Sequence, residues 1–529
     1  MPNLSDLSTR DRKHKSRSLI LITVDCLRAD HCGFYDYSQP TTPFLNSLAS
    51  ESFVVPTAIV AGAPTYYSFP AILASRMPLA LGRDIVGLVP GEPTLATELR
   101  ASGYATAAFS AANPYISPRF GYDQGFDVFH DFLNRDSLNN DSEPGSPGDA
   151  VPPQPAPKNS LRGNLNHSTE RLAAVLGLSK LHAELYFQYR MKIAPAANLD
   201  ALRRFPTADV LVNQAQSWLA SLAERPFFLW LHLMDPHSPY YPHPDAFRDL
   251  TGTNIQSDRA RYLNEYWNRS DLLPSGFHRK RREVVQLYDA GIRWVDSQIA
   301  RLVDGLKQMN LWDDCALALT ADHGEEFLEH GGRYHAPTRL TEEIIRVPLL
   351  IRVPGESPAK CAAKFPSSPM SHLHLAPTLL EIAGAAAPST FHGHSLWSNL
   401  QQGIPWDDPA IIECVYGCTN PFRMETRTAS RLLGIRESRF KLVMRIEDGA
   451  KEEIYDLQSN PTETSVETRN GIVAPGDTRK RLLQTARQHL DKSLSTRDIT
   501  LRLRARLRDL RYENSATHRD LESAADDLG

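Results

Sequence analysis

Short, continuous apolar runs alternate along this chain with longer segments in which apolar residues recur at helical spacing. The runs are residues 18–24, 104–109, 227–231 and 315–320. The helical segments are residues 94–101, 208–223 and 283–309. A continuous apolar run of this length indicates a strand that is buried on both faces. Strands that alternate with helices predict an α/β fold with a mostly parallel central sheet flanked by helices.

Two segments depart from this pattern. Residues 1–17 are polar and basic, so we expect a disordered arm. Residues 134–170 are rich in proline, glycine and asparagine and cannot bury a core, which predicts a surface insertion or lid. The insertion would interrupt a catalytic domain that we place at residues 18–360.

The last third of the chain predicts a smaller C-terminal α+β subdomain, which we place at residues 361–480. Residues 371–382 have helical character, and residues 439–445 and 453–457 are typical of two strands in a small antiparallel sheet. A basic helical tail at residues 481–529 would follow.

One face of the tail helix is apolar and carries Ile499, Leu503, Leu507 and Leu510, with arginines mostly elsewhere. A basic amphipathic helix can dock on a membrane surface or a partner protein. Packing on its own domain is the simpler interpretation.

Composition narrows the class of protein. The chain has 529 residues, of which 41% are hydrophobic and 23% charged, which excludes a wholly disordered or fibrous protein. A net charge of -4 gives no global field for nucleic acid, so we expect no nucleic-acid partner. The apolar run at residues 19–24 is too short for a bilayer span or a signal core, and no later segment reaches the length of a transmembrane helix. We therefore expect no transmembrane segment, a cytoplasmic location and reduced cysteines.

Candidate chemistry follows three of the predicted strands, which end at Asp25, Asp235 and Asp322. Ligands of open α/β sheets bind at the carboxyl ends of strands. One such aspartate is more often a helix N-cap, but three with histidines nearby favour a shared site. Asp322 and His323 together offer oxygen and nitrogen to a divalent cation, and Asp25 adds a second hard oxygen.

A hydroxyl is the candidate nucleophile of this site. Thr65 precedes a predicted helix, for which we expect Ser68 as N-cap and Pro70 in the first turn. A hydroxyl at the positive end of a helix that also contacts a metal becomes easier to deprotonate. A turn hydroxyl is the alternative role for Thr65, and Ser68 is its rival as nucleophile.

Several ordered motifs resemble the sulfatase family within the alkaline phosphatase superfamily. They are residues 21–31, 41–43, 232–240, 320–326, 329–331 and 346–351, and the resemblance covers roughly residues 18–460. It implies a large, mostly parallel sheet domain with a smaller C-terminal subdomain and a bound divalent metal. Several motifs in the same order are far more specific than one signature.

The resemblance also implies roles for individual residues. Asp25, Asp322 and His323 stand at the family's metal-ligand positions, and Thr65 stands at the position of the nucleophile. His237 stands where the family places a histidine that contacts the substrate anion or the leaving group.

The chain departs from the family at two places. Sulfatases resemble one another in a Cys or Ser followed by Pro two residues later and Arg four residues later, and this chain has Thr65, Tyr67 and Phe69 at those three positions. A threonine cannot yield the formylglycine aldehyde that sulfatases form from the Cys or Ser. Cys26 stands where many sulfatases carry another aspartate of a calcium site. The remaining ligands, Asp25, Thr65, Asp322 and His323, favour manganese or zinc, with calcium possible.

His335 lies where sulfatases often place a sulfate-binding lysine. It could serve as a cationic clamp, a general acid or a ligand of a second metal, and His330 lies close to it in the sequence. A loop histidine is otherwise usually a solvated surface group.

These observations predict a metal-dependent hydrolase that cleaves a sulfate or phosphate (di)ester through Thr65 and a covalent intermediate. The substrate would be a small anionic ester, a lipid or a glycan. The alternative is a phosphotransferase of the phosphoethanolamine or glycerophosphate type that acts on a lipid or glycan. A binding module without activity is a third hypothesis, and the polar groups at strand ends argue against it.

Overall fold

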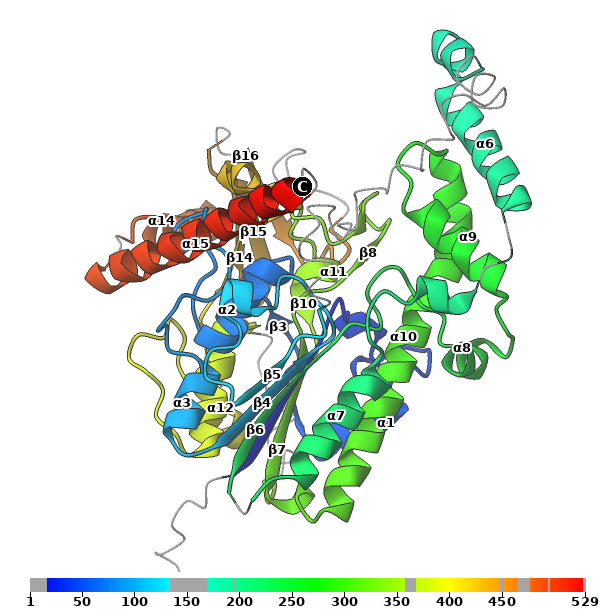
Figure 1. Ribbon diagram of the computed structural model, residues 1–529. Coiled ribbons are helices and arrows are strands. Elements are labelled where there is room, and N and C mark those ends of the chain that lie inside the picture. The colour runs from blue at the N-terminus through cyan, green and yellow to red at the C-terminus, as the bar shows by residue number, and fades with distance from the viewer. Residues whose placement is uncertain are drawn as a thin grey trace, which may run out of the picture.

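A seven-stranded sheet forms the centre of the protein (Figure 1). In spatial order its strands are β2 (Phe53–Val54), β11 (Leu349–Arg352), β7 (Cys315–Ala321), β1 (Ser18–Val24), β6 (Phe227–Leu233), β4 (Ala105–Ser110) and β5 (Val128–His130). β1 pairs in parallel with β6 and β7, and β4 pairs in parallel with β5 and β6. β11 runs antiparallel to β7 and β2. The predicted α/β fold with a mostly parallel central sheet is confirmed.

The computed structural model describes residues 17–133, 169–194, 196, 198–223, 225–356, 368–447, 451–463, 476–492 and 495–526. The predicted arm, apart from residue 17, and residues 134–168 of the predicted insertion lie outside the described residues.

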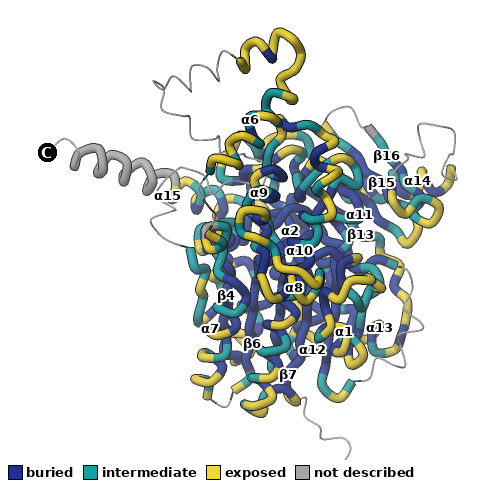
Figure 2. Tube along the Cα trace, turned by 90° about the vertical axis from the view of Figure 1, so that its right-hand side faces the viewer, coloured by how far each residue is buried: buried dark blue, intermediate teal, exposed yellow. Residues whose placement is uncertain are grey.

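Helices cover both faces of the sheet. α1 (Pro43–Ala49), α7 (Ala208–Ala220) and α10 (Pro274–Gln308) lie on one face, and α2 (Thr65–Ala74), α3 (Leu95–Ala101) and α12 (Leu375–Ala383) lie on the other (Figure 1). The strands are continuous apolar runs because both of their faces are buried in this way. α8 (Pro244–Thr251) and α9 (Ser257–Trp267) pack on α10, and α6 (Ser179–Ile193) projects beyond them with most of its residues exposed or half-buried (Figure 2).

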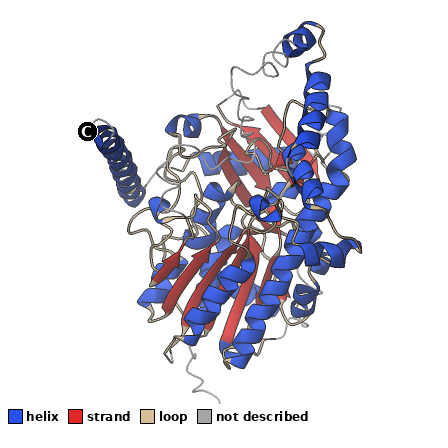
Figure 3. Cartoon of the chain, turned by 45° about the vertical axis from the view of Figure 1, so that its right-hand side comes forward, coloured by secondary structure: helices blue, strands red, loops and turns tan. Residues whose placement is uncertain are grey.

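A second, antiparallel sheet lies above the first (Figure 3). It consists of β13 (Ala410–Val415), β14 (Arg431–Arg436), β15 (Phe440–Arg445) and β16 (Lys451–Asp456), and α14 (Gly476–Leu490) packs on it. The predicted antiparallel strands near the C-terminus are thus present. The fully buried Lys441 donates a hydrogen bond from Nζ to the carbonyl oxygen of Leu340 at 2.7 Å, which ties this sheet to the main domain.

Further short elements connect the larger ones. They are β3 (Ala58–Ile59), β10 (Arg346–Val347) and β12 (Met370–Ser371) in a three-stranded sheet, the pair β8 (Glu326–Phe327) and β9 (Arg333–Tyr334), α11 (Glu342–Ile345) and α13 (Trp397–Gln402). Among the described residues, none of the helices combines the length and apolar character that a bilayer-spanning helix requires.

The C-terminal helix α15 (Thr496–Asp526) packs on its own domain, but not through the face that the sequence singles out. Leu501 and Ala505 are buried against Leu81, Ile85 and Val89. The predicted apolar face, represented by Leu503 at 61% exposure, points away from this contact.

The start of α2 corrects one prediction. The helix begins at Thr65, with Pro64 in the N-cap position, so Ser68 and Pro70 lie inside it. The backbone amides of Tyr67 and Ser68 donate to the carbonyl oxygen of Pro64, at 2.9 and 3.2 Å, which closes the first turn before Ser68. Thr65 is therefore the first residue of the helix rather than a residue of the preceding turn.

Candidate active site

The candidate site lies at the carboxyl ends of two neighbouring strands. β1 and β7 are in register with Val24 opposite Ala321, so Asp25 and Asp322 follow adjacent strand ends. Both aspartates are fully buried. The backbone amide of Cys26 donates to Oδ1 of Asp322 at 3.3 Å and joins the two loops.

Thr65 meets these loops from α2. Its Oγ1 lies 3.1 Å from Nε2 of His323 and donates to Oδ2 of Asp25 at 3.5 Å. As the first residue of a ten-residue helix, Thr65 also lies at the positive end of the helix dipole. The hydroxyl of Ser68 instead donates to the carbonyl oxygen of Asp322 at 2.6 Å and is fully buried.

The ring of His323 is oriented for a metal. Its Nδ1 lies 2.9 Å from the carbonyl oxygen of Gly324, which can only accept, so Nδ1 carries the proton. Nε2 faces Thr65, Asp25 and Asp322, at 3.4 Å from Oδ2 of Asp322, and these carboxylates raise the pKa of His323, so a cation bound there would take the place of the Nε2 proton. A histidine held in this way by a carbonyl group is typical of metal sites.

Buried carboxylates give the site an excess of negative charge. Oδ2 of Asp322 and both carboxylate oxygens of Glu325 are buried and accept no hydrogen bond from the described residues. Burial raises the pKa of Glu325 to about 7, against the opposing effect of His237 and His323. Burial and the charge of Asp25 likewise raise the pKa of Asp322. Orphaned carboxylate oxygens beside an imidazole nitrogen fit a divalent cation.

Asp25 keeps its charge in the same surroundings. Burial acts against ionisation, yet His237, the hydrogen bond with His232 and the charge of His323 hold the pKa of Asp25 well below its usual range. The Asp25 carboxylate is therefore the anionic centre of the cluster.

His335 and Cys26 lie beside this cluster. Nδ1 of His335 is 3.4 Å from Sγ of Cys26 and 3.5 Å from Oε1 of Glu325. Burial lowers the pKa of His335 to about 3, so its ring is neutral at physiological pH and does not supply the positive charge of a cationic clamp.

His237 completes the set of residues singled out from the sequence. It is half-buried, and its Nδ1 bonds the carbonyl oxygen of Ser238, which leaves Nε2 without a bond to that group. One of its ring nitrogens lies within 4.8 Å of ligand atoms of Asp25 and Cys26. Burial lowers the pKa of His237.

Two polar residues from the same motifs lie outside the cluster. Asp235 accepts from the backbone amide of Ala208, at 3.1 and 3.2 Å, in the first turn of the earlier helix α7, and its Oδ1 lies 3.3 Å from Nε2 of His243. The Nε2 atom of His330 is 3.1 Å from a carboxylate oxygen of Glu343. The site is built on two strand ends and α2 rather than on three strand ends.

Asn113 and His232, both buried, were missed by sequence reasoning, and Glu325 lies in the motif at residues 320–326 without a ligand role of its own. Asn113 donates from Nδ2 to Oδ2 of Asp25 at 3.2 Å, and Nε2 of His232 lies 3.4 Å from the same oxygen. Glu325 contributes the orphaned carboxylate. Asn113 and Glu325 each follow a predicted strand closely, which is a signal that could have found them. His232 lies within β6 among apolar residues, and the sequence gives no such signal for it.

A cavity of about 70 Å³ opens beside Thr65, His237 and His335. Its walls are largely apolar and include Tyr66, Tyr115, Phe205, Met234 and Pro337. The described residues that line it include no lysine or arginine. An anionic group in this cavity would therefore depend on a bound cation, on polar hydrogens and on the helix end.

Comparisons with curated proteins place the chain among sulfatases. The sequence model "Sulfatase" matches residues 17–385, and the model "N-sulphoglucosamine sulphohydrolase, C-terminal" matches residues 329–485. Choline-sulfatase of Rhizobium meliloti (strain 1021) is 27% identical over 262 residues, which cover 46% of each chain. Arylsulfatase K of Bos taurus is 26% identical over 285 residues, which cover 47% of this chain and 50% of the relative. The chain thus spans about half the length of the curated relatives it matches.

Solved structures share the fold over nearly the whole chain. A protein solved in complex with its substrate D-glucosamine-2-N,6-O-disulfate has a TM-score of 0.60 at 18% identity, and the match covers 91% of this chain and 99% of the chain of that protein. The phosphonate monoester hydrolase of Agrobacterium radiobacter has a TM-score of 0.57 at 18% identity, and the match covers 92% of this chain and 96% of the hydrolase chain. With the family model matched across the whole central sheet, the chain belongs to the sulfatase family.

Proposed function

We propose that this protein is a metal-dependent ester hydrolase in which Thr65 is the nucleophile. The observation that carries the proposal is the position of the Thr65 hydroxyl, 3.1 Å from Nε2 of His323 and 3.5 Å from Oδ2 of Asp25 at the start of α2. Asp25, Asp322, His323 and the Thr65 hydroxyl would hold the cation, with manganese or zinc favoured over calcium. A cation bound there would ease deprotonation of the hydroxyl and offset charge on the ester.

The reaction would take place in two displacements. Thr65 Oγ1 forms a bond to the phosphorus or sulfur atom while the bond to the leaving oxygen breaks, and a covalent ester on Thr65 results. The leaving alkoxide takes up a proton equivalent to the one that Thr65 loses. Water then attacks the same atom, the bond to Thr65 breaks, and Thr65 regains its proton. The net change is ester plus water to acid plus alcohol.

His237 is the proposed carrier of these protons. Its Nδ1 is held by the carbonyl oxygen of Ser238, which leaves Nε2 to exchange a proton with the leaving group or with water. The lowered pKa of His237 means that the neutral, proton-accepting form predominates near neutral pH.

The substrate that we favour is a phosphate monoester or diester with an apolar leaving group. A threonine does not support the formylglycine chemistry of sulfate hydrolysis, and the apolar walls of the cavity fit an aryl or acyl group better than a sugar. A sulfated substrate is the alternative, because the curated relatives above are named as sulfatases.

The test is a matrix of substrates, metals and variants. Aryl phosphate, aryl phosphodiester and aryl sulfate are assayed with manganese, zinc, calcium and chelator. Thr65→Val keeps the shape of the side chain but removes the hydroxyl, so we expect kcat to fall by at least a thousandfold, while Thr65→Ser keeps measurable turnover. Acid quenching of the parent should trap one phosphoryl or sulfuryl group on a Thr65 peptide, detected by mass spectrometry.

Ser68→Ala is the matched control. The Ser68 hydroxyl is bonded to the carbonyl oxygen of Asp322, so its loss should leave the covalent adduct on Thr65 in place. Turnover that survives in Thr65→Val, or an adduct on Ser68, would contradict the proposal. An adduct on Thr65 that is released faster by an alcohol than by water would favour phosphotransfer over hydrolysis.

A further inference from the structure

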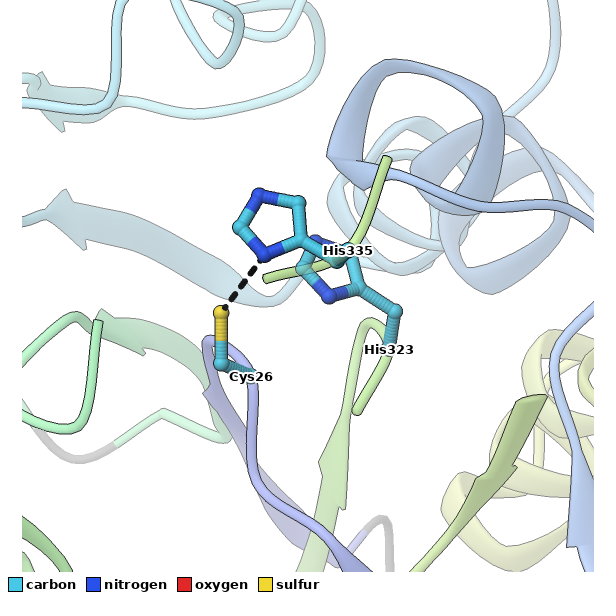
Figure 4. Close-up of side chains that lie close together, drawn as sticks. All are labelled: Cys26, His323 and His335. Carbon is cyan, nitrogen blue, oxygen red and sulfur yellow. Dashed lines mark hydrogen bonds between the residues drawn. The ribbon is translucent and has the colours of Figure 1, made fainter. Parts of the chain in front are cut away.

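A buried free cysteine lies at the edge of the hydrophobic core in the candidate site, where its sulfur atom also contacts polar groups. Cys26 directly follows Asp25, is fully buried and is a free thiol. Its φ of 61° is rare for a residue with a side chain. Its Sγ lies 3.0 Å from Oδ1 of Asp25 and 3.4 Å from Nδ1 of His335 (Figure 4).

The ligand atoms around Cys26 have the spacing of a metal site. Cys26, His323 and His335 each offer one atom, and the three atoms lie within 4.8 Å of one another. Figure 4 shows the two imidazole rings side by side above the sulfur atom. In a tetrahedral site with metal–sulfur and metal–nitrogen bonds of about 2.3 and 2.05 Å, the sulfur and nitrogen atoms are about 3.6 Å apart. The observed 3.4 Å between Cys26 and His335 is close to this value.

The same atoms belong to one continuous cluster. Asp25, Cys26 and His237 form a second set within 4.8 Å, and Asp25, Asp322 and His323 form a third. Asp25, Cys26 and His323 each belong to two sets, so the sulfur atom faces the same space as the carboxylates.

A second observation is the buried carboxylate that Glu325 contributes on the same side of the cluster. Glu325 is fully buried, both of its carboxylate oxygens are without a hydrogen bond from the described residues, and Oε1 lies 3.5 Å from Nδ1 of His335. A buried carboxylate left in this way is costly unless a cation or proton neutralises it.

The geometry points to Cys26 as a thiolate ligand of the metal ion in this site, with His335 as a second ligand on the same side. A thiolate and two imidazoles select zinc-class cations over calcium, which prefers six to eight oxygen ligands. The inference rests on the proposed function only in placing a cation here, because it assigns no step of the reaction to Cys26.

Cobalt(II) is the probe that reports a thiolate ligand directly. The full-length protein is freed of metal with a chelator, titrated with cobalt(II), and then competed with zinc and calcium. We expect a sulfur-to-cobalt charge-transfer band in the near ultraviolet that zinc removes and calcium does not. Cys26→Ser should lose the band and bind zinc at least tenfold more weakly, and Cys26→Asp should lose the band while it gains affinity for calcium.

Cys32→Ser is the matched control. Cys32 is also buried and lies six residues along the chain, but its Sγ donates to the carbonyl oxygen of Arg28 rather than facing the cluster. This variant should keep both the band and the zinc affinity. Circular dichroism and the unfolding midpoint establish that each variant is folded before titration.

The outcomes separate this inference from the proposed function. Cobalt that fails to bind, cobalt that binds without the band, or a band that persists in folded Cys26→Ser would overturn the role of Cys26, whatever the rate of turnover. Turnover that persists in Thr65→Val would overturn the proposed function, but that result says nothing against the cobalt band. Loss of the band in Cys26→Ser and its retention in Cys32→Ser and Thr65→Val would support the thiolate ligand.

Discussion

Gly324 separates the proposed ligand His323 from Glu325, and a methyl group has no room there. A Cβ atom at this position would lie 1.9 Å from the carbonyl oxygen of Glu343, which also accepts from the amide of Glu325 at 3.1 Å. We predict that Gly324→Ala forces the two segments apart, lowers the free energy of unfolding by about 1–3 kcal/mol and weakens zinc binding. Denaturant unfolding and metal titration measure the two effects.

Gly476→Ala is the control for this prediction. Gly476 begins α14, and a Cβ atom there meets nothing within 4 Å. Its substitution should change neither quantity measurably. A Gly324→Ala protein as stable and as metal-competent as the parent would show that the loop after β7 is not held in the described position.

Phe205 forms part of the apolar wall of the cavity and packs edge-on against His237, with ring centroids 5.4 Å apart. If the leaving group of the substrate lies against this wall, Phe205→Ala should lower kcat/KM for an aryl ester about fivefold through a higher KM, since one aromatic contact contributes about 1 kcal/mol. A methyl ester of the same acid does not reach the wall and should be affected less. Equal losses for both esters would mean that Phe205 acts through His237 instead.

Individual residues of the site were predictable to different degrees. Asp25, Asp322 and His323 follow apolar runs directly, so their convergence could be expected from the topology of a parallel sheet. Asp235 has the same local pattern but bonds the first backbone amide of the earlier helix α7, and a contact between such distant segments has no local signature. The orphaned state of Glu325 depends on the packing of distant segments and has no local signature.

At the scale of elements, α10 fixes the start of α1 through one carboxylate. Asp296 is buried, and its two oxygens accept from the backbone amides of Phe44 and Leu45, each at 2.9 Å. Burial raises the pKa of Asp296 to about 6, against the opposing effect of these two hydrogen bonds. The folded protein therefore binds this proton more tightly than the unfolded chain, in which an aspartate titrates near about 4.

The raised pKa of Asp296 makes the free energy of unfolding depend on pH. The contribution of the protonated Asp296 is fully present below about pH 4 and is lost as pH rises to about 6, with a change of up to about 3 kcal/mol. We predict that the free energy of unfolding of the parent, minus that of Asp296→Asn, falls over this range and is constant above it. Denaturant unfolding at a series of pH values measures the difference, and a difference independent of pH would contradict the prediction.

Element boundaries were less predictable than the elements themselves. Pro70 suggested the first turn of α2 because proline is favoured there, but the helix begins five residues earlier, at Thr65. All ten residues of α2 are buried, so no amphipathic pattern marks its start. The sheet strands were easier to predict, since burial on both faces leaves a continuous apolar run in the sequence.

At the scale of the whole molecule, the order of helices and strands along the chain predicts the fold class. The strands at one edge of the central sheet depend instead on long-range packing. Four apolar runs alternating with helices were sufficient to predict four of the five parallel strands of the central sheet, and the short edge strand β5 was missed. The antiparallel strand β11 and the two-residue strand β2 at its edge depend on contacts with β7 and with each other, which no local pattern indicates. The catalytic, C-terminal and tail boundaries, the cytoplasmic location and the choice of metal stay predictions.

The C-terminal helix α15 shows how far packing can depart from amphipathic pattern. The small side chain of Ala505 and the side chain of Leu501 make the apolar part of its contact with the main domain. Arginines make the polar part by bonding backbone carbonyl groups. Arg508, for example, donates to the carbonyl oxygens of Leu88 and Val86 at 2.6 and 2.9 Å. Such a contact combines little apolar area with many directed hydrogen bonds. Hydrophobic periodicity alone therefore selected the wrong face.

This contact can be tested with two substitutions to the same residue on opposite faces of α15. Ala505 is fully buried, so Ala505→Asp places an unpaired carboxylate in the contact. This should weaken the docking free energy of α15 by about 2–4 kcal/mol and detach the helix. Proteolysis within residues 495–526 should then be faster. Leu503→Asp, on the exposed face, should be cleaved at the rate of the parent. Because the proposed catalytic and metal-binding residues lie on α2 and in the loops after β1, β6 and β7, the folded Ala505→Asp protein should keep its turnover. Equal cleavage of both variants would mean that α15 is not held by this face, whereas lost turnover in Ala505→Asp would mean that its contact with residues 81–89 also supports the neighbouring α2.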